Sequence, residues 1–299
     1  MRILIIGSKG FIGSHLVNYY QKQEGIQVWG CDVVTDYPAK NYFLIDASNS
    51  DFNEVFQAQS FDACINCSGS ASVPVSMQNP SRDYHLNVLN VFNILEAIRR
   101  YLPNCKFLNL SSAAVYGNPQ QLPIKEEALP NPLSPYGWHK LYSELLCKEF
   151  NQNFGIQTCS LRIFSAFGVG LQKQLFWDWH QKALSSNKLL VYGTGSESRD
   201  FIYIYDLVNA IACVLANGNF QAGIYNIGNG SEVFIKDVIR AFQEHHHASF
   251  EYEFSNETRA GDPINWVADV EKLKSLGYKQ TISFEDGVKD YCKWLKGKE

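Results

Sequence analysis

The segment "RILIIGSKGFIGSHLVNYY", residues 2–20, decides the fold. A short apolar run ends at a glycine, two further glycines follow at three-residue intervals, and an amphipathic stretch continues from them. Glycines between a buried strand and a helix permit a tight turn and let backbone N–H groups approach a pyrophosphate at the positive end of the helix. The pattern therefore predicts a dinucleotide-binding turn made by Gly7, Gly10, Phe11, Ile12 and Gly13.

Short apolar runs and longer amphipathic stretches alternate on the C-terminal side of this segment. Strands are expected over 27–32, 41–46, 62–69, 105–112 and 157–164, and helices over 52–59, 83–102 and 135–155. Continuous apolar strands separated by helices are typical of a parallel sheet covered on both faces. We expect an α/β, Rossmann-type doubly wound parallel sheet over residues 1–167. A smaller C-terminal substrate-binding α/β region is expected over 168–299, with elements near 200–228 returning to the larger domain.

Composition and charge restrict the classes of function. The 299 residues carry a net charge of −4 and no long basic run, so no nucleic-acid partner is expected. The first apolar run is too short for a signal peptide or a membrane span. Cys64 and Cys67 have no second pair that would complete a zinc site. We expect no metal, no membrane partner, reduced thiols and a cytoplasmic location. The run 245–247, three histidines, is expected on a solvated helix face because consecutive residues point in different directions.

The second predicted strand ends in Asp32, about 20 residues after the glycines. A carboxylate there can accept hydrogen bonds from both hydroxyls of an adenosine ribose, and it would repel a 2′-phosphate. NAD is therefore the expected cofactor. Lys9, inside the glycine turn, keeps NADP as the alternative.

The segment "SPYGWHK", residues 134–140, places a phenol and an ammonium one helical turn apart. Ser134 is a good N-cap and Pro135 a good first helical residue, so Tyr136 and Lys140 are expected on one face of a helix. A free phenol is a poor base at neutral pH, and a neighbouring ammonium together with an oxidised nicotinamide would lower its pKa. The strand before it ends in "LNLSSAAVYG", which brings a serine to the edge where open α/β sheets bind ligands.

Together with "SRDFIYIYDL" and "RAGD", these motifs resemble the extended short-chain dehydrogenase/reductase family, in its nucleotide-sugar epimerase and dehydratase branch. The resemblance covers essentially the whole chain, with UDP-glucose 4-epimerases as the most similar type. It implies a nucleotide-diphosphate sugar as substrate and a homodimer formed by helices around 84–102 and 135–153. It assigns catalysis to Ser112, Tyr136 and Lys140, with Ser111 structural. Tyr136 and Lys140 are also expected to contact the cofactor, where Lys140 would bind the nicotinamide ribose. It assigns cofactor contacts also to Asp46, Ala47, Ser68, Gly69 and Asn87, and substrate contacts to Ser112, Ser165, Arg199, Arg259 and Trp266. Ser165 departs from the asparagine of many relatives.

The residues after Ser112 restrict the reaction. Relatives that eliminate water carry an acidic pair there, whereas this chain has Ala113-Ala114, so a 4,6-dehydratase is not favoured. A 4-epimerase, which oxidises and re-reduces the sugar at C4, is the expected activity. A 4-keto-sugar reductase and a non-catalytic NAD-binding sensor remain as alternatives.

Three further positions have alternative interpretations. Trp266 either restricts the sugar pocket against an N-acetyl group or is a core aromatic. Phe176 or Trp177 either stacks on the base or packs in the interior. Asp206 is expected to orient a neighbouring loop.

Overall fold

The structure is a computed structural model, described over residues 1–47, 50–257 and 261–298. Its centre is a seven-stranded sheet in the order β11-β6-β5-β4-β1-β2-β3, in which all neighbouring strands are parallel. The predicted α/β parallel sheet is confirmed. Its strands are β1 (Arg2–Ile6), β2 (Gln27–Asp32), β3 (Tyr42–Leu44), β4 (Ala63–Asn66), β5 (Lys106–Ser112), β6 (Thr158–Ile163) and β11 (Gln221–Ile227).

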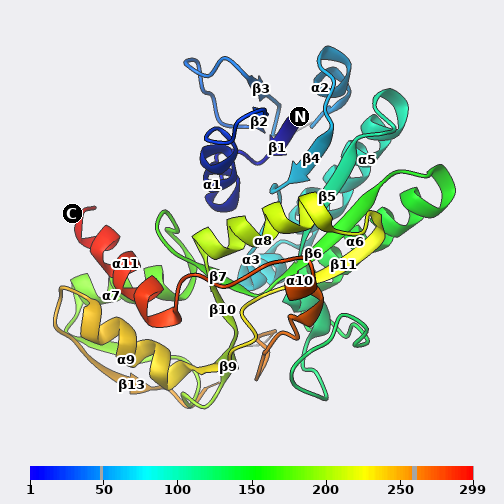
Figure 1. The fold of residues 1–299 in the computed structure, drawn as a ribbon. Helices are drawn as coiled ribbons and strands as arrows, with labels where there is room; N and C mark the ends of the chain where they lie inside the picture. The colour runs from blue at the N-terminus through cyan, green and yellow to red at the C-terminus, as the bar shows by residue number, and fades with distance from the viewer. Residues whose placement is uncertain (48–49, 258–260, 299) are drawn as a thin grey trace.

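Helices cover both faces of this sheet (Figure 1). Side chains of β1 alternate between the faces: Ile3 and Ile5 belong to one core cluster, and Leu4 and Ile6 belong to the other. The first cluster is closed by α1 (Phe11–Tyr20) and α8 (Ile204–Asn217). The second is closed by α2 (Asn53–Ala58), α5 (Asn90–Tyr101) and α6 (Pro135–Phe154).

The prediction of a single regular α-helix over 83–102 is wrong. Residues 73–101 form α3 (Val73–Gln78), α4 (Pro80–Tyr84), a π-helical turn η1 (His85–Leu89) and α5. Asn79 starts α4, because its side chain accepts a hydrogen bond from the backbone N–H of Arg82 at 3.0 Å and proline occupies the next position. The wider π turn carries Asn87, and such turns occur frequently at functional sites.

After β6, the elements other than α8 and β11 lie to one side of the sheet (Figure 1). β7 (Ser165–Phe167) pairs with β10 (Phe201–Tyr203), β9 (Ser198–Arg199) with β12 (Val233–Phe234), and β8 (Lys188–Val191) with β13 (Glu251–Phe254). The helices here are α7 (Gln174–Ser185), α9 (Ile235–His245), α10 (Glu271–Ser275) and α11 (Phe284–Lys296). A buried aromatic cluster that includes Phe167, Phe176, Trp179 and Phe242 joins α7, α9 and β7 to the main core.

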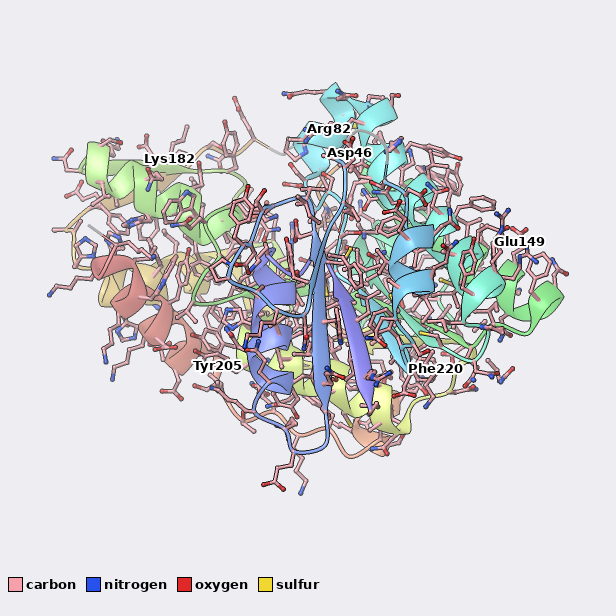
Figure 2. The ribbon with its side chains drawn as sticks, turned by 90° about the horizontal axis from the view of Figure 1, so that it is seen from above. Asp46, Arg82, Glu149, Lys182, Tyr205 and Phe220 are labelled. Atoms are coloured by element: carbon pink, nitrogen blue, oxygen red, sulfur yellow. The ribbon has the colours of Figure 1, made fainter. Side chains whose placement is uncertain are left out.

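The two ends of the sheet can be told apart in Figure 2. Asp46, which follows β3, and Arg82 of α4 lie at one end of the molecule, whereas Phe220, which precedes β11, lies toward the other. The first end is therefore the carboxyl edge of the strands, where open α/β sheets bind ligands. No helix within the described residues is long and apolar enough to cross a membrane.

Candidate functional site

The glycine turn has the geometry that close approach to a ligand requires. Gly7 has φ +78°, and a Cβ on it would lie 2.7 Å from the carbonyl carbon of Cys67. A Cβ on Gly13 would lie 2.1 Å from the carbonyl oxygen of Gly7. Gly10 is the N-cap of α1 and offers no side-chain cap, so Phe11 and Ile12 begin the helix with free N–H groups. This arrangement fits a pyrophosphate.

Asp32 lies at the carboxyl end of β2 beside this turn. Its carboxylate accepts hydrogen bonds from the backbone N–H groups of Lys9 at 2.8 Å and Val33 at 2.7 Å. The Lys9 ammonium forms an ion pair with Asp36. The cation that could have attracted a 2′-phosphate is therefore already paired with a carboxylate, which agrees with the preference for NAD predicted from Asp32.

The other predicted cofactor residues lie along the same edge of the sheet. Asp46 and Ala47 follow β3 and are exposed, and Ser68 follows β4, where its hydroxyl donates to Asn66 Oδ1 at 2.6 Å. Gly69 has φ +116°, and a Cβ on it would lie 2.5 Å from Asn87 Oδ1. Asn87 is buried and donates to the carbonyl oxygen of Ser70 at 3.2 Å. Its Oδ1 has no hydrogen-bond partner within the described parts of the chain.

Ser112, Tyr136 and Lys140 are brought to this edge by β5 and α6. Ser112 ends β5, and its Oγ accepts a hydrogen bond from Ala114 N at 3.2 Å within the short 3₁₀ helix η2 (Ala113–Tyr116). The helix α6 begins as predicted, because Ser134 Oγ accepts from Gly137 N at 3.2 Å. Lys140 Nζ donates to the carbonyl oxygen of Leu110 at 2.9 Å and lies 5.9 Å from the centroid of the Tyr136 ring.

Burial dominates the pKa of the two α6 side chains. Burial raises the pKa of Tyr136 to about 12, although a hydrogen bond with Ser112 acts in the opposite direction. Burial lowers the pKa of Lys140 to about 8. The lowering of the tyrosine pKa that was expected from the ammonium together with an oxidised nicotinamide stays a prediction. Desolvation of the phenol dominates, because both side chains are more than nine-tenths buried.

A buried network behind Ser112 was not predicted from the sequence. Arg162 of β6 forms a bidentate ion pair with Glu144 of α6, with Nη2–Oε2 at 2.8 Å and Nε–Oε1 at 3.0 Å. Ser111 Oγ donates to Glu144 Oε1 at 2.5 Å, which confirms its structural role. Glu144 lies four residues after Lys140 on the same helix face. The four-residue spacing, which places Glu144 on the helix face that carries Tyr136 and Lys140, was the available sequence signal.

A second buried pair, of a histidine and a carboxylate, was also not predicted from the sequence. His139 Nδ1 lies 2.6 Å from Asp83 Oδ2, and both residues are buried. His139 stands directly before Lys140, and Asp83 lies on α4. A cavity of about 240 Å³ is lined by Asp83 and Arg82 of α4, by the segment 69–72 and by Lys173, which precedes α7. Asp83 of this pair therefore borders the cavity.

Two predicted substrate residues meet beside the turn that follows Ser112. Arg199 Nη1 donates to the carbonyl oxygens of Ser198 at 2.8 Å and Ile264 at 3.0 Å, and its guanidinium lies 5.6 Å from the centroid of the Trp266 ring. Trp266 Nε1 donates to the carbonyl oxygen of Gly117 at 2.8 Å. The indole is half-buried, so it can both pack and border a pocket.

The other two predicted substrate residues are less informative. Ser165 is half-buried in β7, and its backbone N–H donates to the carbonyl oxygen of Asp200 at 2.9 Å. Arg259 lies outside the described residues.

Three of the remaining sequence interpretations can be judged. Phe176 is buried in the aromatic core, so the base-stacking interpretation is wrong for it. His246 is buried and lies 3.0 Å from His180, so the solvated-face prediction is wrong at this position. The reason is that α9 and α7 pack their aromatic faces together, which the local pattern does not reveal. Asp206 accepts hydrogen bonds from Thr281 and Ile282, which confirms its loop-orienting role.

All eight cysteines are free, and no group of three or more His, Cys, Asp or Glu residues in the described parts of the chain could hold a metal ion.

Comparisons with known proteins agree with this geometry. A family model described as the NAD dependent epimerase/dehydratase family matches residues 3–228. A protein of Methanocaldococcus jannaschii, provisionally named a UDP-glucose 4-epimerase, is 30% identical over 98% of each chain. The crystal structure of a UDP-glucuronic acid 4-epimerase from Bacillus cereus, in complex with UDP-glucuronic acid and NAD, is 27% identical over the full length of both chains, with a TM-score of 0.90. That of a UDP-glucose 4-epimerase from Thermus thermophilus, in complex with NAD, is 25% identical over 99% of each chain, with a TM-score of 0.89.

Proposed function

Because the chain belongs to the NAD-dependent epimerase/dehydratase family, we propose that it is an NAD-dependent 4-epimerase of a UDP-hexose. The relatives described above carry the names of UDP-sugar 4-epimerases, and the two solved ones hold NAD. The observation that carries the proposal is the convergence of Ser112, Tyr136 and Lys140 at the carboxyl edge of the sheet, next to the glycine turn. Ala113 and Ala114 follow the serine and cannot transfer protons, which argues against dehydration.

The residues at the carboxyl edge of the sheet fit NAD as the cofactor of this reaction. The pyrophosphate would lie at Gly7, Gly10 and Gly13, two of which (Gly7 and Gly13) leave no room for a Cβ, and the adenosine ribose would lie at Asp32. Asn87 and Gly69 would line the nicotinamide side. Bound NAD supplies the hydride acceptor and, when oxidised, a positive charge.

The chain's own groups would handle the proton and the anchoring of the substrate. Tyr136 Oη takes the proton of the sugar 4-hydroxyl and later returns it to the same oxygen. Ser112 Oγ accepts from Ala114 N and keeps its own proton to donate to that sugar oxygen. The ammonium of Lys140 stabilises the phenolate. Arg199 binds the diphosphate, because a guanidinium pairs with two phosphate oxygens at once, and this leaves the sugar free to turn.

The test is to incubate the purified protein with UDP-glucose and to separate the products. We expect the 4-epimer to form with no net reduction of the cofactor. Tyr136→Phe is the control, because it should keep the fold and the bound NAD while lowering turnover by about 100-fold or more. Stoichiometric consumption of NADH or NADPH by a 4-keto-sugar nucleotide, without epimer formation, would assign a reductase instead.

We also propose a homodimer formed by the helices around 84–102 and 135–153. Leu89, Phe92 and Leu145 are 38%, 40% and 52% exposed on these helices, which makes an apolar surface that a second copy could bury. Leu145→Glu should convert the dimer to a monomer in sedimentation velocity experiments. Leu129→Glu is the matched control, because Leu129 is 89% exposed and belongs to the segment between η2 and α6 rather than to either helix. A monomeric wild-type protein would contradict the proposal.

The proposal also assigns the two ligands to different parts of the chain and the protein to a cellular compartment. Residues 1–167, together with α8 and β11, would hold the dinucleotide, and the elements around Arg199 and Trp266 would hold the nucleotide sugar. A cytoplasmic location is supported by eight free cysteines, because a reducing compartment keeps thiols unpaired.

A further inference from the structure

Asp200, which directly follows Arg199, is a fully buried carboxylate between β9 and β10. Ser198, on the other side of Arg199, is also fully buried, whereas Arg199 itself is only partly buried. Side chains alternate along an extended segment, so Ser198 and Asp200 point into the protein while Arg199 points to the opposite side. The two residues beside Arg199 are therefore the ones that anchor its backbone.

The Asp200 carboxylate is bound by backbone N–H groups of two other segments. Its Oδ1 accepts a hydrogen bond from Asn229 N at 2.8 Å, in the loop after β11. Its Oδ2 accepts from Gly230 N at 2.8 Å and from Ala268 N at 3.0 Å. A Cβ on Gly228 would lie 2.9 Å from the same Oδ2, so this loop packs closely on the carboxylate. Because hydrogen bonds to an ionised group are about twice as strong as neutral ones, Asp200 fixes both segments against β9.

The segment 264–268 makes the contacts that surround the Arg199 guanidinium. Arg199 Nη1 donates to the carbonyl oxygen of Ile264 at 3.0 Å, and the guanidinium lies 5.6 Å from the centroid of the Trp266 ring. The backbone of Ser198 binds the first part of this segment, because its N–H donates to Ile264 O at 3.1 Å and its carbonyl oxygen accepts from Trp266 N at 3.1 Å. The buried carboxylate binds the last residue of the segment. The segment is thus attached to β9 on both sides of Arg199.

We propose that Asp200 is a positioning residue of the diphosphate site: its carboxylate fixes the segment 264–268 beside β9 and thereby holds the Arg199 guanidinium in place for two phosphate oxygens. This role rests on the proposed function, in which Arg199 binds the diphosphate. A side chain that is ordered before binding loses less conformational entropy on binding, which raises the affinity. Asparagine has the same shape but one carbonyl oxygen, and its NH₂ group would face N–H donors. Asp200→Asn should therefore loosen the segment without removing a group that contacts the substrate.

The test is the affinity for UDP, measured by isothermal titration calorimetry at pH 8 on the protein saturated with NAD. Asp200 is ionised at this pH, because burial raises its pKa only to about 6. Asp200→Asn should weaken UDP binding by about 10-fold, which is within the coupling that residues of one hydrogen-bonded network show. Arg199→Met should also weaken UDP binding. In the Arg199→Met background, Asp200→Asn should add less than about 2-fold, because it acts through the guanidinium.

Asp206→Asn is the matched control, because Asp206 of α8 is also a fully buried carboxylate that accepts backbone hydrogen bonds. Its donors are Thr281 N at 3.0 Å and Ile282 N at 2.9 Å. Asp206→Asn should lower thermal stability, as Asp200→Asn does, and should leave the UDP affinity unchanged. The proposal would be overturned by equal UDP affinities of wild type and Asp200→Asn, by equal losses of affinity in the two variants, or by losses that add to that of Arg199→Met. Each of these results would leave Asp200 as a residue of the fold alone.

Hydrogen exchange on the wild type gives a second measurement that needs no variant to fold. The amides of Asn229, Gly230 and Ala268 should be protected before UDP is added, and UDP should slow their exchange no more than it slows that of β5. A larger slowing at these three amides would show that the arrangement forms only with the ligand, and would overturn the proposal, as would a wild type that does not bind UDP. Since UDP binding is measured without turnover, a failure to epimerise UDP-glucose would be seen separately.

Discussion

Replacing Lys140 by methionine should abolish turnover and make the fold more stable at neutral pH. The lysine is 7% exposed, and its pKa falls from 10.5 to about 8 because of burial. A difference of about 2.5 pKa units corresponds to about 3 kcal/mol of unfavourable free energy for the charged form in the folded state. Methionine has a similar length and no charge. It loses the hydrogen bond to the Leu110 carbonyl oxygen, which is worth about 1 kcal/mol. The net expectation is a gain of about 2 kcal/mol in the free energy of unfolding.

The pH dependence of this gain has a definite sign. Below pH 8 the lysine is charged in both the folded and the unfolded chain, so the unfavourable free energy is present in full. Between pH 8 and 10.5 the unfolded chain holds a proton that the folded protein lacks, and wild-type stability gains from rising pH through this window. The advantage of Lys140→Met should therefore be constant up to about pH 8 and should shrink toward pH 10.5.

Urea denaturation at pH 7, 8, 9 and 10 measures the difference between the two proteins. Lys22→Met is the control, because Lys22 is exposed at the end of α1 and its replacement should change stability by the same small amount at every pH. A Lys140→Met variant that is less stable than wild type at pH 7, or an advantage that grows with pH, would refute the reasoning.

The geometry makes three further predictions. Gly13→Ala should lose bound NAD, measured by absorbance of the released cofactor, because its Cβ would lie 2.1 Å from the Gly7 carbonyl oxygen. Retained NAD would contradict the proposed role of the turn. Arg162→Met should lower the free energy of unfolding in urea by about 3–5 kcal/mol, because it leaves Glu144 buried without its cation; an unchanged value would show that Glu144 is protonated or solvated. Trp266→Ala should raise the kcat/KM for an N-acetylated UDP-hexose relative to the plain UDP-hexose, and an unchanged ratio would leave Trp266 as a packing residue.

The fold could be predicted because its determinants are local. The glycine turn combines an apolar strand, glycines that permit a positive φ, and the start of a helix, all within 2–20. The start of α6 follows from a capping serine and a proline at the first position. The prediction of one regular helix over 83–102 was wrong, because a π turn at 85–89 interrupts the helix although the apolar pattern of the sequence is continuous there.

The contacts around the catalytic side chains could not be predicted, because they join segments that are far apart in the sequence. Asp83 and His139 are 56 residues apart, and Trp266 bonds to a carbonyl 149 residues away. The same limit explains the errors at Phe176 and His246. An amphipathic pattern marks the two faces of α7 and α9, but it does not say which aromatic or histidine side chains a partner helix will cover.

Helix α6 shows why charge alone misleads a sequence interpretation. Tyr136, Lys140 and Glu144 recur at four-residue spacing, and a pattern based on hydrophobicity assigns such a stripe to solvent. In the structure all three are buried, and two of them, Lys140 and Glu144, carry groups that are charged in water, so their burial is unfavourable unless a partner is supplied. Arg162 is the ion-pair partner of Glu144, and the Leu110 carbonyl oxygen accepts a hydrogen bond from Lys140. Burial lowers the pKa of Lys140 to about 8, so the presence of this lysine at the carboxyl edge is better explained by the proposed catalysis than by folding.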